Sequence, residues 1–488
     1  MLPQKNNVAP LRNRIIVKVA ESFINDRFEN ADNIPAEIMP DGSVPYHASL
    51  DIDRSIVKQI ALAVMGFSPD DEKDSAKSLK EYGKEALARE KLLPSKLSVI
   101  TSACAACMKQ QHVVTNFCRG CIARPCQVNC PKGAISFTEA NRAQINPDMC
   151  INCGICLNSC PYNAIIKVPV PCEDSCPVGA ITKDADGKEH IDNEKCISCG
   201  KCLRSCPFGA IVEPYQLIDV LKLLKDSDKK VVAMLAPAVL GQFGGTINNL
   251  VGALKKLGFT EVYEVAVGAD ITTAKEAAEF IERMEKGEKF MTTSCCPAYF
   301  RAAKTSIPEI APYVSETHTP MYYTAEKIKE EHPDYLTVFV GPCYAKRVEA
   351  ESDPYVDYVI TFEEAGAMFD ADKIKVEECE AMDFAEISCY QGRQFPVTGG
   401  VAGAVKSLVD GKMEMRAETV DGLTKEGLKT LKRYALKGCD NNMIEVMCCE
   451  GGCVAGPGCL AMPRKAAVAV DKYVKTGCDL RERLENQK

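Results

Sequence analysis

Tryptophan is absent from this 488-residue chain, and histidine occurs only five times. No stretch approaches the ~20 consecutive apolar residues that a membrane-spanning helix requires. Residues 1–14 also lack the apolar core of a signal peptide. These absences predict a cytoplasmic protein with no membrane segment. The net charge of −8 argues against a nucleic-acid binder, because contact with phosphate backbones requires basic surface.

Cysteine is present in excess. The chain has 27 cysteines, and sixteen of them lie between Cys104 and Cys206. Cytoplasmic thiols stay reduced, so this density indicates metal binding rather than a disulfide scaffold. The hydrophobic fraction of 46% is enough for a large core, and the length suggests about three domains of ~150 residues.

Hydrophobic spacing divides the rest of the chain. Residues 1–100 contain no cysteine, and their hydrophobic spacing predicts a mainly helical region. We expect this region to have a packing or docking role. Residues 214–465 alternate strands with helices, which predicts an α/β domain with mostly parallel strands. Residues 466–488 are expected to form a C-terminal helix. In the α/β domain, strands are predicted over 231–237, 261–270, 336–343, 355–362 and 443–449, and a helix over 274–286.

The cysteine-rich block contains a repeat. Four Cys-Pro-x-x-Ala-Ile units begin at Cys130, Cys160, Cys176 and Cys206, in two pairs with an internal period of 30 residues. The units at Cys160 and Cys206 end C-x2-C-x2-C-x3-C-P runs, the pattern of bacterial ferredoxin [4Fe–4S] ligation. The repeat predicts α+β ferredoxin-like modules, a two-cluster module over 101–168 and a second one over 169–213.

Cluster ligands follow from the rule that the fourth cysteine of each run ligates the other cluster. Three predicted ligand sets are Cys118, Cys121, Cys126 and Cys160; Cys150, Cys153, Cys156 and Cys130; and Cys196, Cys199, Cys202 and Cys176. The second module lacks two ligands, because Ile166 and Pro169 occupy their positions. The remaining pair, Cys104 and Cys107, is hypothesised to complete a fourth cluster with Cys172 and Cys206. Zinc binding or free thiols remain open for this pair, and His112 remains open as a ligand near Cys118.

Three further cysteine motifs each follow a predicted strand. They are TSCCP at 293–297, PCYAK at 342–346 and EVMCCEGGC at 445–453. The carboxyl ends of parallel strands meet at one edge of a sheet, so the three segments can converge on one cofactor. Gly451 and Gly452 allow the backbone to approach a bulky ligand. Four thiolates there could hold one more cubane cluster.

In order and type, these motifs resemble those of the [FeFe]-hydrogenase catalytic domain over about residues 230–465. The resemblance implies two parallel-sheet lobes around an H-cluster, a [4Fe–4S] cubane linked to a diiron subsite with CO, cyanide and azadithiolate. By position, it implies cubane ligands Cys296, Cys343, Cys449 and Cys453. It further implies that Lys346 and the segment Ala236, Pro237 and Ala238 contact the cyanides, and that Met447 packs against the diiron unit.

The same resemblance implies a proton path that runs outward through Cys295, Glu279, Ser315 and Glu276. The two glutamates are spaced i, i+3 and so share a helix face. The implied activity is reversible reduction of protons to H2, with ferredoxin supplying electrons through four accessory [4Fe–4S] clusters. Maturation proteins and a monomeric state are also implied, as in the group B branch. The family pattern is altered at Tyr299, Met321, Gly341 and Cys448, which changes the polarity of the diiron pocket and leaves the ligands intact.

Two alternatives share most of these motifs. A non-catalytic hydrogenase-like protein, used in cluster assembly or electron transfer, would keep the cubane ligands and have no use for Cys295. A hydrogen sensor would couple the same site to signalling. Five cysteines have no predicted role, as is ordinary for single thiols: Cys379, Cys389, Cys439, Cys459 and Cys478.

Overall fold

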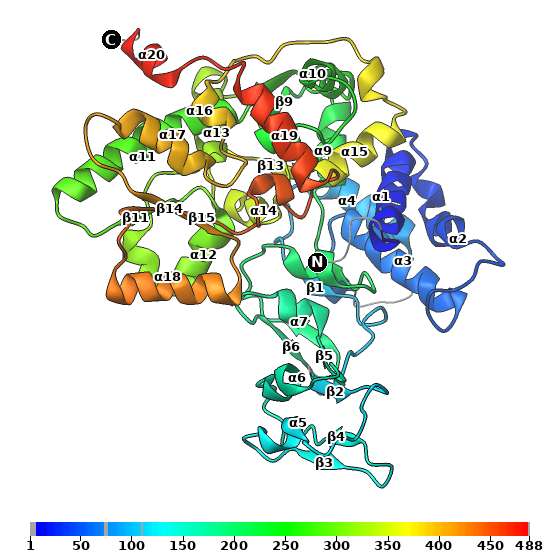
Figure 1. The fold of residues 1–488 in the computed structure, drawn as a ribbon. Coiled ribbons are helices and arrows are strands. Elements are labelled where there is room, and N and C mark those ends of the chain that lie inside the picture. Colours follow the sequence, from blue (N-terminus) through cyan, green and yellow to red (C-terminus); the bar gives the residue numbers. More distant parts are fainter. Residues whose placement is uncertain (1–5, 73–76, 109–110, 487–488) are drawn as a thin grey trace.

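The computed structural model describes residues 6–72, 77–108 and 111–486. Three parts are visible in Figure 1: a group of N-terminal helices in blue, a narrow arm in cyan and green, and a large α/β body. The arm consists of residues 98–212. The arm projects from the body, and its far end carries α5 (Pro125–Val128) with the hairpin of β3 (Ile135–Phe137) and β4 (Ala143–Ile145). A search of the described helices finds none with the length and apolar content to cross a bilayer.

The N-terminal part is helical, as predicted. Ile15, Ile16 and Val19 on α1 and Val57 and Ile60 on α3 are buried in its core. The helix α1 also packs against α15 (Phe362–Ala371) of the body. The elements are α1 (Val8–Ile24), η1 (Phe28–Asn33), α2 (Ile34–Ile38), α3 (Leu50–Val64), η2 (Pro69–Asp71) and α4 (Leu79–Ala88). Residues 1–5 and 73–76 of the predicted helical region lie outside the described residues.

The arm is built from short helices and two-stranded antiparallel pairs. Each Cys-Pro-x-x-Ala-Ile unit leads into a strand, and the alanine N–H donates to the cysteine sulfur, as in Ala134 to Cys130 at 3.3 Å and Ala180 to Cys176 at 3.3 Å. The remaining elements are β1 (Ser98–Val99), β2 (Gln111–Val114), α6 (Ile155–Ser159), β5 (Ile165–Val168), α7 (Pro171–Ser175), β6 (Ile181–Lys183), β7 (Glu189–Ile191), α8 (Lys201–Ser205) and β8 (Ile211–Val212). The pairs are β2 with β5, β3 with β4, β6 with β7 and β1 with β8.

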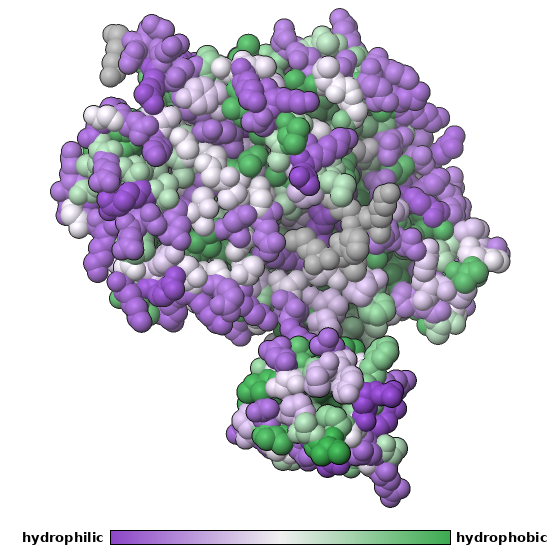
Figure 2. Space-filling model, in the orientation of Figure 1, coloured by the Kyte–Doolittle hydropathy of each residue, from purple (hydrophilic) through white to green (hydrophobic). Residues whose placement is uncertain are grey.

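Apolar side chains are exposed on the first module of this arm. Phe117, Ile122 and Val128 are 74%, 101% and 77% exposed, and Figure 2 shows apolar residues among polar ones on the arm. The second module lies against the body, where Lys201 Nζ donates to Leu423 O at 2.6 Å and Arg204 Nη1 donates to Gly456 O at 3.1 Å. The first module therefore extends outward while the second is anchored.

Two parallel sheets form the body, which confirms the predicted fold class. One sheet has the order β10 (Glu261–Glu264), β9 (Val231–Leu235), β12 (Leu336–Gly341) and β13 (Tyr358–Thr361), and the other has the order β11 (Met291–Thr292), β15 (Met443–Met447) and β14 (Ala417–Asp421). Every strand pairing in these two sheets is parallel. The strands β9, β12 and β15 are almost wholly buried, as expected of strands covered on both faces.

Helices surround both sheets. They are α9 (Leu217–Lys225), η3 (Pro237–Val239), α10 (Ile247–Lys256), α11 (Ala266–Glu285), α12 (Pro297–Thr305), η4 (Pro308–Tyr313), α13 (Pro320–Glu331), α14 (Ala345–Ala350), α15 (Phe362–Ala371), η5 (Val376–Glu378), α16 (Tyr390–Arg393), α17 (Gly400–Val409), α18 (Lys425–Lys437), η6 (Cys453–Ala455), α19 (Pro463–Val474) and α20 (Leu480–Glu485). Aromatic and aliphatic side chains from several of these helices fill the space between helices and sheet.

Two predictions about elements are wrong. The strand expected over 261–270 ends at Glu264, and the apolar run that follows it begins the long helix α11 instead. The single C-terminal helix expected over 466–488 is two helices, α19 and α20. Between them Gly477 passes so close to α16 that a Cβ atom would lie 2.5 Å from Tyr390 N.

Candidate functional site

A cavity of about 100 Å³ lies where strands of both sheets end. The segments after β9, β11, β12 and β15 all reach it, as expected for the carboxyl ends of parallel strands. The four predicted cubane ligands line it together: Cys296, Cys343, Cys449 and Cys453. The other predicted cofactor contacts line the same cavity: Ala236, Pro237, Ala238, Lys346 and Met447. Phe395 and Pro396, which follow α16, also line it and carry no motif that could have identified them.

Local backbone features bring the thiols to the cavity. Cys296 immediately precedes α12, and Pro297 follows at the first helical position, where a missing N–H costs nothing. Gly452 has φ +92°, and a Cβ atom there would lie 2.5 Å from Pro396 O. A side chain at this position would therefore push the loop that carries Cys449 and Cys453 away from its neighbour.

The four thiols in this cavity are partly buried. Burial raises the pKa of Cys343 to about 12, and burial also raises the pKa of Cys453 and Cys449. A buried thiol in an apolar pocket keeps its proton unless a metal ion binds the sulfur and displaces that proton. Four such thiols around a space that no side chain fills are the donor set that a cubane iron–sulfur cluster uses. The residues therefore fit the implied cluster.

Lys346 supplies the positive charge at this site. Its Nζ donates to Thr319 Oγ1 at 2.9 Å and to Glu349 Oε2 at 2.7 Å. Among the described residues these are its two partners, so one of its three N–H donors is left for an anionic group in the cavity. Thr319 and Glu349, which the sequence interpretation did not single out, hold this ammonium in place.

Cys295 faces the cavity beside Glu276. Glu276 is fully buried on α11, and its Oε1 accepts a hydrogen bond from Ser294 N at 3.2 Å. Burial raises the pKa of Glu276 to about 8, so the carboxyl carries a proton at neutral pH. Burial, followed by the neighbouring Glu276, raises the pKa of Cys295 well above its usual range.

A second carboxyl continues toward the surface. The Ser315 hydroxyl lies beside Glu276 and donates a hydrogen bond to Glu279 Oε2 at 2.6 Å. Glu279 also accepts from the N–H of the exposed residue Glu316 at 2.9 Å and pairs with Arg283 at 2.8 Å. All four predicted residues are thus contiguous, but the predicted order of the glutamates is wrong. Glu276 is the inner carboxyl and Glu279 the outer one.

Two smaller cavities lie in the arm, and each contains one predicted ligand set. Cys118, Cys121, Cys126 and Cys160 line one, and Cys130, Cys150, Cys153 and Cys156 line the other. The exchange of the fourth ligand between the halves of the repeat is therefore visible in the geometry. His112 lies at the second of these cavities rather than near Cys118, and its Nδ1 is 3.2 Å from Asn152 Oδ1.

Thiols also gather in the second module. Cys176, Cys196 and Cys199 all lie close enough to Cys202 to raise its pKa, after the larger effect of burial. Cys104 and Cys107 act in the same way on Cys206, and Cys206 acts on Cys172. The structure therefore brings Cys104 and Cys107 to the two cysteines that lacked partners in the sequence.

Iron content tests this fourth set. Replacing Cys104 and Cys107 together with alanine is expected to lower the iron content of the reconstituted protein by about four atoms per chain, one cubane. Iron would be measured colorimetrically against protein from amino-acid analysis. The matched control replaces Cys379 and Cys439, which lie outside every set, and should lose no iron. Unchanged iron in the Cys104/Cys107 variant would contradict the assignment.

The second module reaches the cavity at the strand ends of the two sheets, called the central cavity from here on, at Cys199. Cys199 lines that cavity together with Cys448, and a hydrogen bond from the Cys448 thiol lowers the pKa of Cys199 to about 7. Cys448 is one of the four residues at which the chain departs from the family pattern, and it directly precedes Cys449. A thiol contact thus connects a ligand of the third predicted cluster to the chain segment that carries the central cubane ligands.

Three protein families match successive parts of the chain. The family described as "Iron only hydrogenase large subunit, C-terminal domain" matches residues 229–457. The "4Fe-4S dicluster domain" matches residues 117–164, and the "LdpA Fe-S cluster-binding domain" matches residues 166–216.

Similar proteins include two hydrogenases. Iron hydrogenase 1 of Clostridium pasteurianum is 29% identical over 295 residues, 49% of this chain and 51% of that protein. The periplasmic [Fe] hydrogenase large subunit of Nitratidesulfovibrio vulgaris is 30% identical over 303 residues, 50% of this chain and 72% of that protein. A probable cytosolic Fe–S cluster assembly factor of Anopheles gambiae is 24% identical over 289 residues, 48% of this chain and 60% of that protein. The chain spans about half the length of the first of these relatives.

Fold and site together define a modular iron–sulfur protein with a ferredoxin-like arm and an α/β body. The chain belongs to the iron-only, or [FeFe], hydrogenase family.

Proposed function

We propose that this chain is an [FeFe]-hydrogenase that catalyses the reversible reduction of protons to H2, with electrons relayed from ferredoxin through four [4Fe–4S] clusters. The position of Cys295 carries the proposal. Its thiol faces the cavity, and Glu276, Ser315 and Glu279 connect it to the surface. Cluster assembly and electron transfer require cluster ligands, but neither requires a buried chain of proton donors and acceptors.

The chain's residues would hold and orient the H-cluster, which when bound supplies the iron chemistry that combines protons and electrons. Cys296, Cys343 and Cys449 would ligate the cubane, and Cys453 would also connect it to the diiron subsite. Lys346 would donate its remaining N–H to a cyanide, a charge-assisted hydrogen bond. The apolar walls at Ala236–Ala238 and Met447 would exclude water.

Protons would move inward through groups that this chain places in sequence. Glu279 meets solvent beside Glu316 and exchanges its proton through the Ser315 hydroxyl with Glu276. Glu276, with a pKa of about 8, holds a proton at neutral pH and can release it to Cys295 once that thiol has passed its own proton into the cavity. Relays work best when the pKa of the donor lies near the operating pH.

Electrons would travel along the arm toward the body. The cavity lined by Cys118, Cys121, Cys126 and Cys160 lies on the outer module, and the set with Cys199 lies against the central cavity. Ferredoxin would therefore deliver electrons to the outer module. The proposal includes maturation proteins that insert the diiron subsite, a monomeric state and a cytoplasmic location, all on the strength of family resemblance.

Infrared spectroscopy tests the proposal. Protein reconstituted with iron and sulfide would be loaded with a synthetic diiron complex, and its spectrum recorded under argon and under H2. We expect CO and cyanide bands that are shifted from those of the free complex and that change under H2. A Cys453→Ala variant, which lacks the bridging thiol, should retain no such bands.

One alternative has support of its own, the similarity to the Anopheles assembly factor. A cluster-assembly or electron-carrier protein would contain the central cubane and bind no diiron complex. Iron analysis and electron paramagnetic resonance on the same sample would show whether the cubane is present. A loaded cubane with no CO or cyanide bands would therefore reject the hydrogenase proposal in favour of this alternative.

A further inference from the structure

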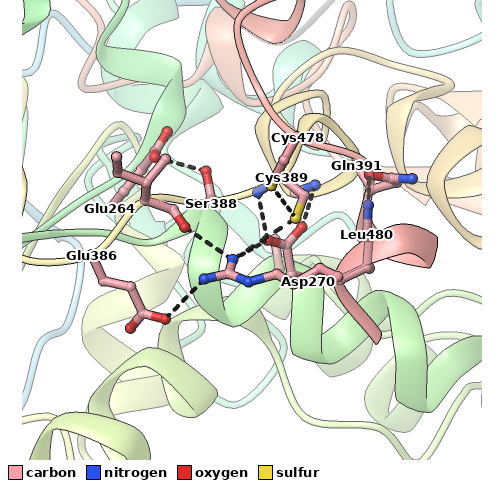
Figure 3. Close-up of polar contacts among 12 residues, drawn as sticks. Glu264, Asp270, Glu386, Ser388, Cys389, Gln391, Cys478 and Leu480 are labelled. Atoms are coloured by element: carbon pink, nitrogen blue, oxygen red, sulfur yellow. Dashed lines mark hydrogen bonds and ion pairs between the residues drawn. The ribbon is translucent and has the colours of Figure 1, made fainter. Parts of the chain in front are cut away.

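Two cysteines outside every cluster set face each other across the C-terminal part of the body. Cys389 lies just before α16 and is fully buried, whereas Cys478 lies between α19 and α20 and is exposed. Their sulfur atoms are 2.8 Å apart, and Figure 3 shows the two side chains pointing toward each other. The other thiols that had no predicted role are placed differently: Cys379, Cys439 and Cys459 contact the carbonyl oxygens of Lys375, Asn441 and Cys453.

The backbone holds this pair in register. Cys389 and Cys478 form an isolated parallel β-bridge, and Tyr390 N donates to Cys478 O at 2.9 Å. Cα atoms of bridged residues lie about 5 Å apart, within the range that a disulfide spans without backbone movement. Gly477, with no side chain, permits the close approach.

Charged groups surround the buried sulfur. Arg483 Nη1 lies 3.8 Å from Cys389 Sγ and 3.9 Å from Asp270 Oδ2, and its Nη2 lies 3.5 Å from Glu386. A guanidinium beside a thiol favours the thiolate, the form that attacks a disulfide. Burial and the adjacent Cys478 oppose this by raising the pKa of Cys389. The exposed Cys478 is therefore the sulfur that an external disulfide reaches first. The buried Cys389 is placed to attack the Cys478 sulfur in a second step.

The segment that carries Cys478 is attached to the body mainly by polar contacts. In α20 only Leu480 is buried. Gln391 Nε2 donates to Asp479 Oδ1 at 2.8 Å and its Oε1 accepts from Leu480 N at 2.9 Å, while Arg393 Nη1 donates to Thr476 at 2.8 Å. All these contacts involve α16, whose Gly392 N donates to Asp270 of α11 at 2.9 Å. A covalent bond at this point would therefore fasten the C-terminal segment to α16 and, through it, to α11.

We propose that Cys389 and Cys478 are a reversible thiol–disulfide pair that fastens the C-terminal segment, residues 475–486, to the body when it is oxidised by an organic disulfide. The Cys478 thiolate attacks one sulfur of the oxidant RSSR, which forms a mixed disulfide and releases one RSH. The Cys389 thiolate then attacks Cys478 Sγ and displaces the second RSH. One S–S bond is made in the protein and one is broken in the oxidant, which takes up the two electrons and both thiol protons.

Mass spectrometry tests the pair on the cluster-loaded protein under argon. Protein treated with glutathione disulfide or with dithiothreitol would be alkylated, digested and mapped. We expect a Cys389–Cys478 linked peptide only after glutathione disulfide, with unchanged iron content. The Cys389→Ser variant should stop at a glutathione adduct on Cys478, whereas Cys478→Ser should yield neither link nor adduct. The control Cys379→Ser should form the link as the unaltered protein does.

Carboxypeptidase digestion tests the fastening. Removal of the C-terminal residues should be about tenfold slower in the oxidised protein than in the reduced protein, because the cross-link lowers the population of the open segment. This difference should disappear in Cys389→Ser. If both thiols remain free after excess glutathione disulfide, the pair is not redox active and the proposal is overturned. A linked peptide with unchanged digestion would overturn the fastening role.

Discussion

Replacing Cys295 with serine is expected to lower H2 evolution by about 10²–10⁴-fold, the usual contribution of a positioned proton donor. Serine preserves size and hydrogen bonding, but its hydroxyl is a far weaker acid than a thiol and would not release a proton to the site. Glu276 would still stand behind it with its proton, so the path would be interrupted at its last member. Turnover would be measured with chemically reduced methyl viologen, which removes any dependence on a protein partner.

The control for this experiment is another cysteine-to-serine change. Cys439 lies in the connection between α18 and β15, contacts Asn441 O and lines neither the cavity nor the proton path. Cys439→Ser should retain full turnover. Iron content and the infrared bands of the Cys295→Ser variant should also be unchanged, which would separate a lost proton donor from a lost cofactor. Full turnover by Cys295→Ser would refute the role of this thiol.

Replacing Arg347 with methionine is expected to destabilise the protein by about 3–5 kcal/mol, the usual cost of removing one partner from a buried ion pair. Arg347 is fully buried, and its guanidinium pairs with both Glu213 and Glu364, each also buried. Its Nε further donates to Val359 O at 3.2 Å. Without the arginine, two carboxyl groups would remain in a medium that disfavours their charge. Burial already raises the pKa of Glu213 to about 8 despite the arginine.

Thermal unfolding of the cluster-loaded protein, followed by circular dichroism, would measure this effect as a fall of roughly 3–5 °C in the midpoint, because a chain of 488 residues has an unfolding entropy of about 1 kcal/mol/K. Arg416 provides the matched control, because it forms an ion pair with Glu414 in which both side chains are more than half exposed. Arg416→Met should shift the midpoint little. Adding Glu213→Gln and Glu364→Gln to Arg347→Met should recover part of the loss, since neither of these two side chains then carries a buried charge. An unchanged midpoint in Arg347→Met would contradict the argument.

Short-range spacing predicted most of the groups of thiols that the structure brings together. The C-x2-C-x2-C runs determine which thiols can surround one cubane, and strand order determines that Cys296, Cys343 and Cys449 meet at one edge. Elimination led to the hypothesis that Cys104 and Cys107 join Cys172 and Cys206, since only these four cysteines of the block were left over, and the structure brings the four thiols near one another.

Other features depend on tertiary contacts that spacing does not encode. Glu276 and Glu279 share one face of α11, and only the positions of Ser294 and Glu316 decide which is the inner carboxyl. The apolar residues from Val265 to Ala269 fit a strand or a buried helix equally well, and the packing of α11 against α13 and α16 selects the helix. Cys389 and Cys478 are neighbours only because the chain returns to α16 after α19.

The crossed fourth ligand of the arm has a consequence for how the protein is built. Cys160 belongs to the cavity of the first cysteine run, and Cys130 belongs to the cavity of the second. Neither cluster can be completed by its own half of the repeat, so insertion of one draws the two halves together and orders the ligands of the other. Iron loading of this arm should therefore be cooperative, and during biogenesis half-filled arms should be scarce compared with empty and full ones.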